Sequence, residues 1–310
     1  MKIESWQLKQ RQSLPLEIKV KMSKTRVREW YEFYNGNVYI AFSGGKDSTV
    51  LLDIARKLYP NIPAVFLDTG LEYPEIRKFV KTIDNVIWLK PKMRFDEVIT
   101  KYGYPIVSKK VANSISRFRL NPEEVWRYNK FINGTNADGT ATQFSIPKKW
   151  QNLALYASFK ISDHCCTVMK KNPVKRYEKE TGRLPILGMM ASDSTQREID
   201  YLKTGCNSFM SKRPMSNPIG FWLEQDILKY IKIYSIPYSS VYGEICEDGN
   251  VFRTTGEHRT GCMFCMFGVH LEKEPNRFQR MKQTHPKLYR YCMDDLGLKV
   301  PLEFIGVSYD

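Results

Sequence analysis

The sequence predicts an α/β protein with a doubly wound, mostly parallel sheet. Three short apolar runs, residues 37–42, 62–67 and 85–89, are rich in β-branched and aromatic residues, which is typical of buried strands. Segments with helical spacing of apolar residues, 48–58 and 74–83, separate these runs. The alternation of strand and helix favours parallel strands joined by crossover helices.

Further elements extend this pattern on both sides. A basic and aromatic helix is predicted near residues 24–33, ahead of the first strand. After the third strand we predict helices at 95–102 and 107–118, a helix that opens at 121–124, a strand at 184–190, a polar loop at 191–198, a helix at 221–233 and a last helical segment at 285–296. We divide the chain into a helical extension (1–36), an α/β domain (37–235) and a C-terminal cap (236–310).

Composition and charge narrow the class of function. The chain has 310 residues, 42% of them apolar, with 48 Lys and Arg against 33 Asp and Glu, a net charge of +15. That charge favours polyanionic partners, either nucleic acid (DNA or RNA) or small phosphorylated and sulfated molecules. No apolar run approaches the length of a membrane span, and the first residues lack the apolar stretch of a signal peptide. We therefore expect a cytoplasmic protein without a membrane partner.

A glycine-rich turn between the first strand and its helix predicts a phosphate site. The glycine pair lets the backbone approach a ligand closely, and the exposed N–H groups at the start of the helix attract anions. The pattern is not a Walker A loop, because Lys46 is followed by Asp47. Lys46 and Asp47 are the candidate catalytic residues of this loop. The nucleotide-binding residues that we predict here are Ser43, Gly44, Gly45, Lys46, Asp47 and Ser48.

The loop resembles the pyrophosphate loop (PP-loop) of the ATP-pyrophosphatase superfamily. Asp68, Thr69 and Gly70 follow the second strand and are similar to the second motif of one branch, which contains the adenylyl-sulfate (APS) and phosphoadenylyl-sulfate (PAPS) reductases and the DNA phosphorothioation sulfur-transfer enzymes. The resemblance covers residues 25–90 and resumes at Cys165. It implies an adenine nucleotide alpha hydrolase-like fold, and it implies ATP or a related adenine nucleotide, with Mg²⁺, as ligands of these loops.

Four cysteines form the second candidate site. Cys165 and Cys166 are adjacent, and Cys262 and Cys265 form a CxxC pair in the cap. Four thiolates from two loops could close a zinc site or hold a [4Fe–4S] cluster. We favour the cluster, because an adjacent pair chelates one metal ion poorly. Cys206 could substitute as a ligand, although a lone cysteine is more often a small buried apolar residue.

The order of the cysteines resembles the cluster-binding pattern of the iron–sulfur APS reductases. In that family a lysine after the first pair and an arginine after a later strand hold the anionic substrate. Here the matching residues are Lys170 or Lys171, and Arg197, which we also list as a candidate catalytic residue. The family usually has a further arginine at 188–191, where this chain has Gly-Met-Met-Ala. Arg259, just before the CxxC pair, is a further candidate for binding the anion.

One difference from the reductases decides the order of our three hypotheses about function. Those enzymes attack sulfur with a cysteine near the C-terminus, and this sequence has no cysteine after Cys292. Our first hypothesis is therefore an adenylation-dependent, iron–sulfur-assisted sulfur transfer, with nucleic acid as a candidate acceptor. The second is an APS or PAPS reductase in which Cys206, Cys292 or a cysteine of a partner, such as a thiol or sulfur donor protein, serves as the nucleophile. The third is a non-catalytic, nucleotide-binding cluster protein in a larger complex.

Overall fold

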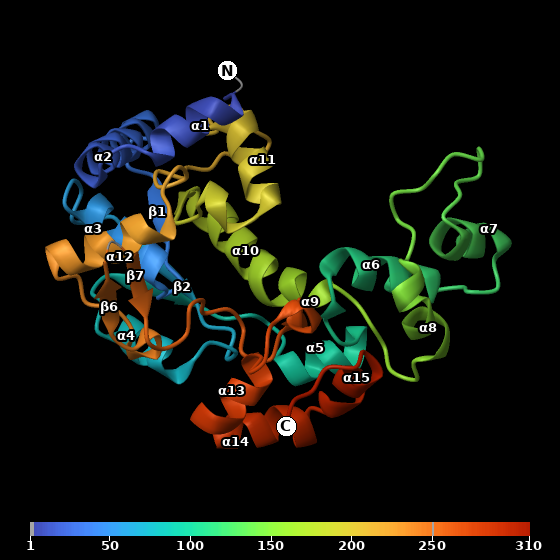
Figure 1. Cartoon of the computed structure of the whole chain (residues 1–310). Helices are drawn as coiled ribbons and strands as arrows, with labels where there is room; N and C mark the ends of the chain where they lie inside the picture. Colours follow the sequence, from blue (N-terminus) through green and yellow to red (C-terminus); the bar gives the residue numbers. More distant parts are fainter. Residues whose placement is uncertain (1–2, 250) are drawn as a thin grey trace. The chain divides into compact units, whose positions relative to one another are not determined.

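The computed structural model describes residues 3–249 and 251–310, and their contacts divide the chain into two units (Figure 1). The first unit consists of Met1–Asp68, Glu72–Lys90 and Val174–Thr260. The second unit consists of Thr69–Leu71, Pro91–Pro173 and Gly261–Asp310.

A parallel sheet of four strands lies at the centre of the first unit. The strands are β1 (Val38–Ala41), β2 (Ala64–Leu67), β3 (Val86–Leu89) and β5 (Leu184–Leu187), in the order β3-β2-β1-β5. Ile40 of β1 is in register with Ala64 on one side and with Ile186 on the other. The predicted α/β class with a parallel sheet is confirmed. β5 ends three residues before its predicted limit, so Met189 and Met190 lie in the loop beyond it.

Helices cover both faces of this sheet. On one face α3 (Lys46–Arg56) contacts β1 and packs against α2 (Leu16–Phe33) and α12 (Glu224–Tyr234). On the other face Tyr39 and Val65 pack against Tyr177 of α10 (Asn172–Thr181). Successive strand residues point to opposite faces, so this arrangement explains why the strand sequences are apolar throughout. The sheet is doubly wound, as predicted.

The remaining elements of the first unit include one correction to the predictions. They are α1 (Ser5–Gln12), α4 (Pro74–Lys81), η3 (Ala191–Asp193), α11 (Thr195–Thr204), η4 (Ser240–Tyr242), β6 (Ile245–Asp248) and β7 (Val251–Thr254). The predicted polar loop 191–198 is wrong in its second half, because Ser194 caps a helix there by accepting a hydrogen bond from the Arg197 N–H. The antiparallel hairpin of β6 and β7 was not predicted.

A buried ion pair fixes the start of α12. Lys19 of α2 is 2% exposed, and its Nζ lies 2.6 Å from Oδ2 of Asp226. The same carboxylate oxygen accepts a hydrogen bond from the Leu223 N–H. Removing one partner of such a pair typically costs about 3–5 kcal/mol, because the other charge stays buried alone. The pair therefore holds the first turn of α12, which carries Glu224, in a defined place.

The second unit is mainly helical. Its elements are α5 (Phe95–Tyr102), β4 (Ile106–Val107), α6 (Lys109–Phe118), α7 (Val125–Tyr128), η1 (Asn129–Asn133), α8 (Lys148–Tyr156), α9 (His164–Cys166), η2 (Thr167–Lys171), β8 (Met266–Phe267), η5 (Val269–Leu271), α13 (Arg277–Thr284), α14 (Pro286–Arg290), η6 (Tyr291–Asp295) and α15 (Lys299–Phe304). The helix predicted to open at 121–124 begins at Val125 instead. Among the described residues, no helix is both long enough and apolar enough to cross a membrane.

Candidate functional site

The predicted phosphate loop lies at the carboxyl end of β1, where the order of the strands reverses. β1 pairs with β2 on one side and with β5 on the other. Ligands of open parallel sheets bind outside the carboxyl ends of the strands at such a switch point. The helix after the loop begins at Lys46, two residues earlier than predicted.

Gly44 is the residue that makes the turn possible. Its φ is +71°, a conformation that side chains disfavour. A Cβ atom at this position would lie 2.7 Å from Cγ2 of Val80 and 2.8 Å from Cγ2 of Ile76, both on α4. Both the backbone conformation and the space therefore require glycine.

We expect Gly44→Ala to destabilise the protein by about 2–5 kcal/mol, since left-handed strain costs about 1–2 kcal/mol and overpacking costs about 1–3 kcal/mol. Gly139→Ala is the matched control, because Gly139 also has a positive φ (+81°) but has open space around the added Cβ. Urea unfolding of both variants measures the difference. Equal losses in the two variants would show that the contact with α4 does not matter.

The two serines of the loop bond to each other. Ser48 Oγ accepts a hydrogen bond from the Ser43 N–H (3.2 Å) and donates one to the Gly45 carbonyl (2.9 Å). The hydroxyl oxygens of Ser43 and Ser48 are 3.0 Å apart. The loop is therefore closed by its own side chains before any ligand binds.

The side chain of Lys46, at the end of this loop, is almost fully buried. It is 4% exposed, and its Nζ donates to the carbonyl of His258 (2.9 Å) and lies 3.0 Å from Oε1 of Glu224. Its backbone N–H, the first of α3, donates to the Tyr242 hydroxyl (3.2 Å). Tyr242 in turn shares a hydrogen bond of 2.7 Å with Thr260. Sequence reasoning did not find Glu224, Tyr242 or Thr260.

Asp47 has a buried oxygen that lacks a hydrogen bond. No described residue forms a hydrogen bond with Oδ1 of Asp47, which lies 3.7 Å from Nζ of Lys46. Burial raises the pKa of Asp47, and the nearby carboxylates of Asp193 and Glu224 raise it further, while Lys46 opposes them. A buried carboxylate oxygen with spare capacity is an acceptor to which a hard cation can bind.

Asp193 brings two of the predicted anion-binding arginines together. Its carboxylate, 7% exposed, forms ion pairs with Arg197 and with Arg259, the second at 3.2 Å. Both arginine side chains are more than 40% exposed. Arg197 and Arg259, which are far apart in sequence, thus lie beside one carboxylate. Sequence reasoning did not single out Asp193, because one aspartate in a polar segment carries no pattern.

The second predicted nucleotide motif, Asp68 to Gly70, has its first residue in the first unit and the other two in the second. Asp68, at the end of β2, is 5% exposed, and its Oδ2 lies 2.9 Å from Nη2 of Arg77 on α4. β1 and β2 are adjacent and parallel, so Asp68 lies at the same edge of the sheet as the phosphate loop. Thr69 and Gly70 belong to the second unit, and their role in nucleotide binding stays a prediction.

All four predicted cysteine ligands line one cavity in the second unit. The other lining residues are apolar except for one lysine: Leu71, Phe95, Pro105, Met169, Lys170 and Phe267. Lys171 is exposed, and neither it nor Cys206 lines this cavity. Cys206 is 7% exposed and packs against Tyr201 in the first unit. Among the described residues, no three His, Cys, Asp or Glu side chains are placed to hold a single metal ion.

Short pairings bring the two cysteine segments together. The CxxC pair precedes β8, which pairs with β4 through Val107 and Phe267. Within the pair itself, the Met263 N–H donates to the Leu71 carbonyl (2.8 Å). The adjacent cysteines lie on α9, which packs against α5. The metal-binding chemistry of cysteine and the resemblance to the cluster-binding pattern predicted that these segments meet, and the structure shows which elements bring them together.

The surroundings of the thiols favour their protonated form in the absence of a cation. Burial raises the pKa of Cys165, and the other three thiols of the cavity raise it further, while Lys170 lowers it. Burial also raises the pKa of Cys265. A metal bound here would have to displace these protons, which couples its affinity to pH.

A family model matches the segment that contains the predicted phosphate loop. Residues 37–104 match the model of the phosphoadenosine phosphosulfate reductase domain. This segment is similar to the phosphoadenosine phosphosulfate reductase domain family. It contains the phosphate loop and the motif from Asp68 to Gly70, whereas all four cysteines of the cavity lie outside it.

The wider similarities extend over most of the chain at low identity. The chain is 24% identical to an uncharacterized protein of Methanocaldococcus jannaschii over 284 residues, 89% of this chain and 52% of the relative, so it spans about half of that relative's length. It is 23% identical to adenosine 5'-phosphosulfate reductase 2 of Bacillus subtilis, over 79% of this chain and 89% of the relative. The solved PAPS reductase from Candida auris, a phosphate complex, is 16% identical with a TM-score of 0.42, over 81% of this chain and 98% of that one.

Proposed function

We propose that this protein uses ATP to activate an oxygen of an acceptor and replaces that oxygen with sulfur. The observation that carries the proposal is a phosphate loop of the PAPS reductase domain family in a chain that also places four cysteines around one cavity. The loop would bind the triphosphate, and the cysteine cavity would hold an iron–sulfur cluster that assists the sulfur step.

The contacts of the loop support a role in phosphate binding. The helix start, Lys46 and the two arginines beside Asp193 together supply N–H groups and positive charge. The Tyr242 hydroxyl now takes the hydrogen bond of the Lys46 N–H, so a phosphate oxygen would replace it there. The orphaned Oδ1 of Asp47 fits a Mg²⁺ ion that arrives with the nucleotide. Lys46 would stabilise the charge on the departing pyrophosphate.

The cysteine cavity fits the donor set of an iron–sulfur cluster. Four sulfurs around one otherwise apolar space, with Lys170 as a counter-charge, match what such clusters take from proteins. When bound, the cluster would supply a site that holds and delivers sulfur. Cys165, Cys166, Cys262 and Cys265 would be its ligands. Zinc is the alternative for the same four residues, but it would require their side chains to move closer together, because no three of those described are now placed to hold one ion.

The proposed reaction balances without an added oxidant or reductant. The acceptor oxygen attacks the α-phosphorus of ATP, a P–O bond forms, and the bond to the β-phosphate oxygen breaks to release pyrophosphate. Hydrosulfide from a sulfur donor then attacks the carbon that carries the adenylate. A C–S bond forms, the C–O bond breaks and AMP leaves with the oxygen and the electron pair of that bond.

A basic segment with exposed aromatic side chains supports single-stranded nucleic acid as the acceptor. Residues 109–160 of the second unit contain nine Lys and Arg against three Asp and Glu. Trp126 is 49% exposed and Tyr156 is 73% exposed. The guanidinium of Arg127 lies over the Trp126 ring, 4.6 Å from its centroid. Exposed rings beside cations are what proteins use to stack bases and neutralise phosphates.

We expect the double variant Trp126→Ala, Tyr156→Ala to bind a labelled single-stranded oligonucleotide at least tenfold more weakly. The reason is that each lost base stack costs about 1–3 kcal/mol. Fluorescence anisotropy at one fixed salt concentration measures the change. Trp6→Ala is the control, because Trp6 is also exposed (62%) but lies in α1 of the first unit. Equal loss in this control would count against the surface.

The test of the whole proposal is turnover by anaerobically purified protein. With ATP, sulfide and single-stranded RNA or DNA, we expect AMP and pyrophosphate in equal amounts and sulfur in the acceptor. The similarity to APS reductases favours one other function, reduction of APS to sulfite by a thiol donor. Sulfite release from APS, with no AMP formed from ATP, would support that function and reject sulfur transfer.

A further inference from the structure

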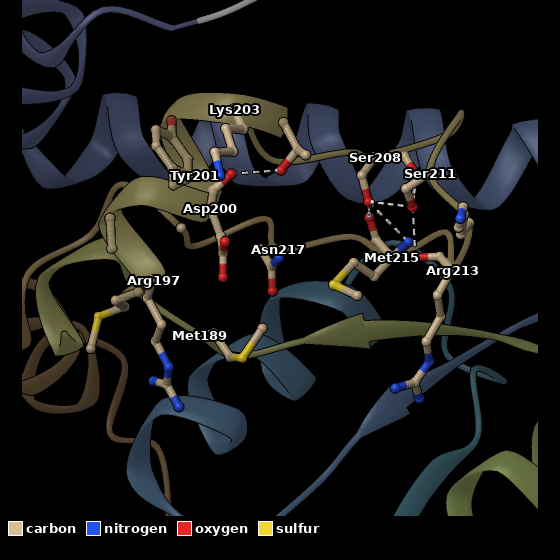
Figure 2. A pocket seen from close by; sticks show the side chains of 15 residues that line it. Met189, Arg197, Asp200, Tyr201, Lys203, Ser208, Ser211, Arg213, Met215 and Asn217 are labelled. Carbon is tan, nitrogen blue, oxygen red and sulfur yellow. Dashed lines mark hydrogen bonds between the residues drawn. The ribbon is translucent and has the colours of Figure 1, made fainter. Parts of the chain in front are cut away.

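A second cavity, of about 360 Å³, lies in the first unit (Figure 2). Its walls come from the loop after β5, from α11 and from the segment 208–220, and no residue of the phosphate loop lines it. The volume falls within the range of about 300–1,000 Å³ that small-molecule sites occupy. The cavity is therefore a candidate site for a ligand other than the triphosphate of ATP.

The apolar part of the cavity suits a flat ring. Met189, Met190 and Met215 line it together with Tyr201. Methionine side chains adapt their shape and make favourable contacts with aromatic rings. Three of them in one cavity favour a planar, polarisable ligand over a compact polar one.

Two hydrogen-bond acceptors point into the same space. Oδ1 of Asn217 is buried and has no hydrogen-bond partner in the part of the chain that the structure describes. Figure 2 shows the side chains of Asp200 and Asn217 pointing the same way, toward Met189. A buried acceptor without a donor is costly, so a ligand with an N–H group would relieve it.

Positive charge surrounds the cavity. Four basic side chains line it, against the single acidic residue Asp200, and they are Arg197, Lys203, Lys212 and Arg213. Arg213 is held by Glu178 at 2.8 Å, as Arg197 is held by Asp193. The two lysines are exposed at the surface. This charge would attract a ligand with an anionic group such as a phosphate.

We propose that this cavity binds a nucleoside monophosphate whose base carries an exocyclic amine. The base lies against the methionines, the amine donates to Asn217 and Asp200, and the phosphate lies near the basic side chains that line the cavity. Cytosine and adenine carry such an amine, whereas uracil has a carbonyl oxygen in its place. This site goes beyond the proposed function: no residue of the phosphate loop lines it, and it shares only Arg197 with the proposed phosphate contacts.

Calorimetric titration of the full chain with CMP and UMP tests the proposal. We expect CMP to bind about tenfold more tightly than UMP, because UMP would set a carbonyl oxygen against two acceptors. The Lys46→Ala variant should keep CMP binding, which separates this site from the phosphate loop. Asn217→Ala should remove the preference for CMP.

Two further variants keep the test decisive. Lys203→Ala with Lys212→Ala changes only exposed side chains, so it should fold, and it should weaken CMP and UMP alike. Met210→Ala is the control, since Met210 is 96% exposed and does not line the cavity. Equal binding of CMP and UMP, absence of binding, or CMP binding that depends on Lys46 and not on Asn217 would overturn the proposal.

Discussion

Lys46→Ala should lower ATP-dependent pyrophosphate release by roughly 100- to 1,000-fold, the usual cost of removing one group that stabilises transition-state charge. Lys46 is 4% exposed and lies at the first turn of the helix that follows the phosphate loop. Pyrophosphate release and the Kd for ATP, both measured on anaerobically purified protein, check this expectation.

A melting curve of the variant must accompany the assay, because Lys46 is buried and is the cation beside the buried Oδ1 of Asp47. The partner Glu224 is 44% exposed and stays solvated when the lysine is gone. Lys57→Ala is the matched control, because this lysine caps the same helix and pairs with Asp53 at 2.8 Å, away from the loop. Unchanged ATP affinity and turnover in Lys46→Ala would remove the loop from the proposed chemistry.

Local patterns predicted the sheet well. β1, β2 and β3 are short apolar runs between helices, and periodicity and turn residues locate such runs without any tertiary information. β5 was predicted too long, because Met189 and Met190 are apolar for another reason: they line a cavity. The first four residues of α11 were predicted as part of a loop because they are polar, although the cap, Ser194, was visible in the sequence.

The candidate sites show where sequence reasoning stops. The phosphate loop and the cysteine pairs are motifs with spacing, and the structure brings the members of each together. Tyr242 and Glu224 could not be found, because they reach Lys46 from distant parts of the chain; Tyr242 is 196 residues away. Asp193 was missed for a related reason, since its importance lies in the two arginines it holds. Long-range contacts of single polar residues leave no periodic signal.

Cys262→Ser should remove the iron and lower thermal stability together. If the four thiols hold a [4Fe–4S] cluster, wild-type protein purified without oxygen should contain about four irons and four sulfides per chain, and the variant close to none. The cluster would also link the segment of α9 to the segment before β8, so its binding free energy is part of folding. Each kcal/mol lost lowers the Tm by about 2–4 °C in a domain of this size.

Cys246→Ser separates this effect from the loss of a thiol as such. Cys246 is exposed in β6 and does not line the cavity, so this variant should keep its iron and its Tm. One zinc and no iron in the wild type would make the four cysteines a structural site, and would leave the phosphate loop to act alone. Unchanged metal content and melting in Cys262→Ser would contradict the ligand assignment itself. The cavity would then be an apolar pocket in which the thiols stay protonated, as their burial favours when no metal is present.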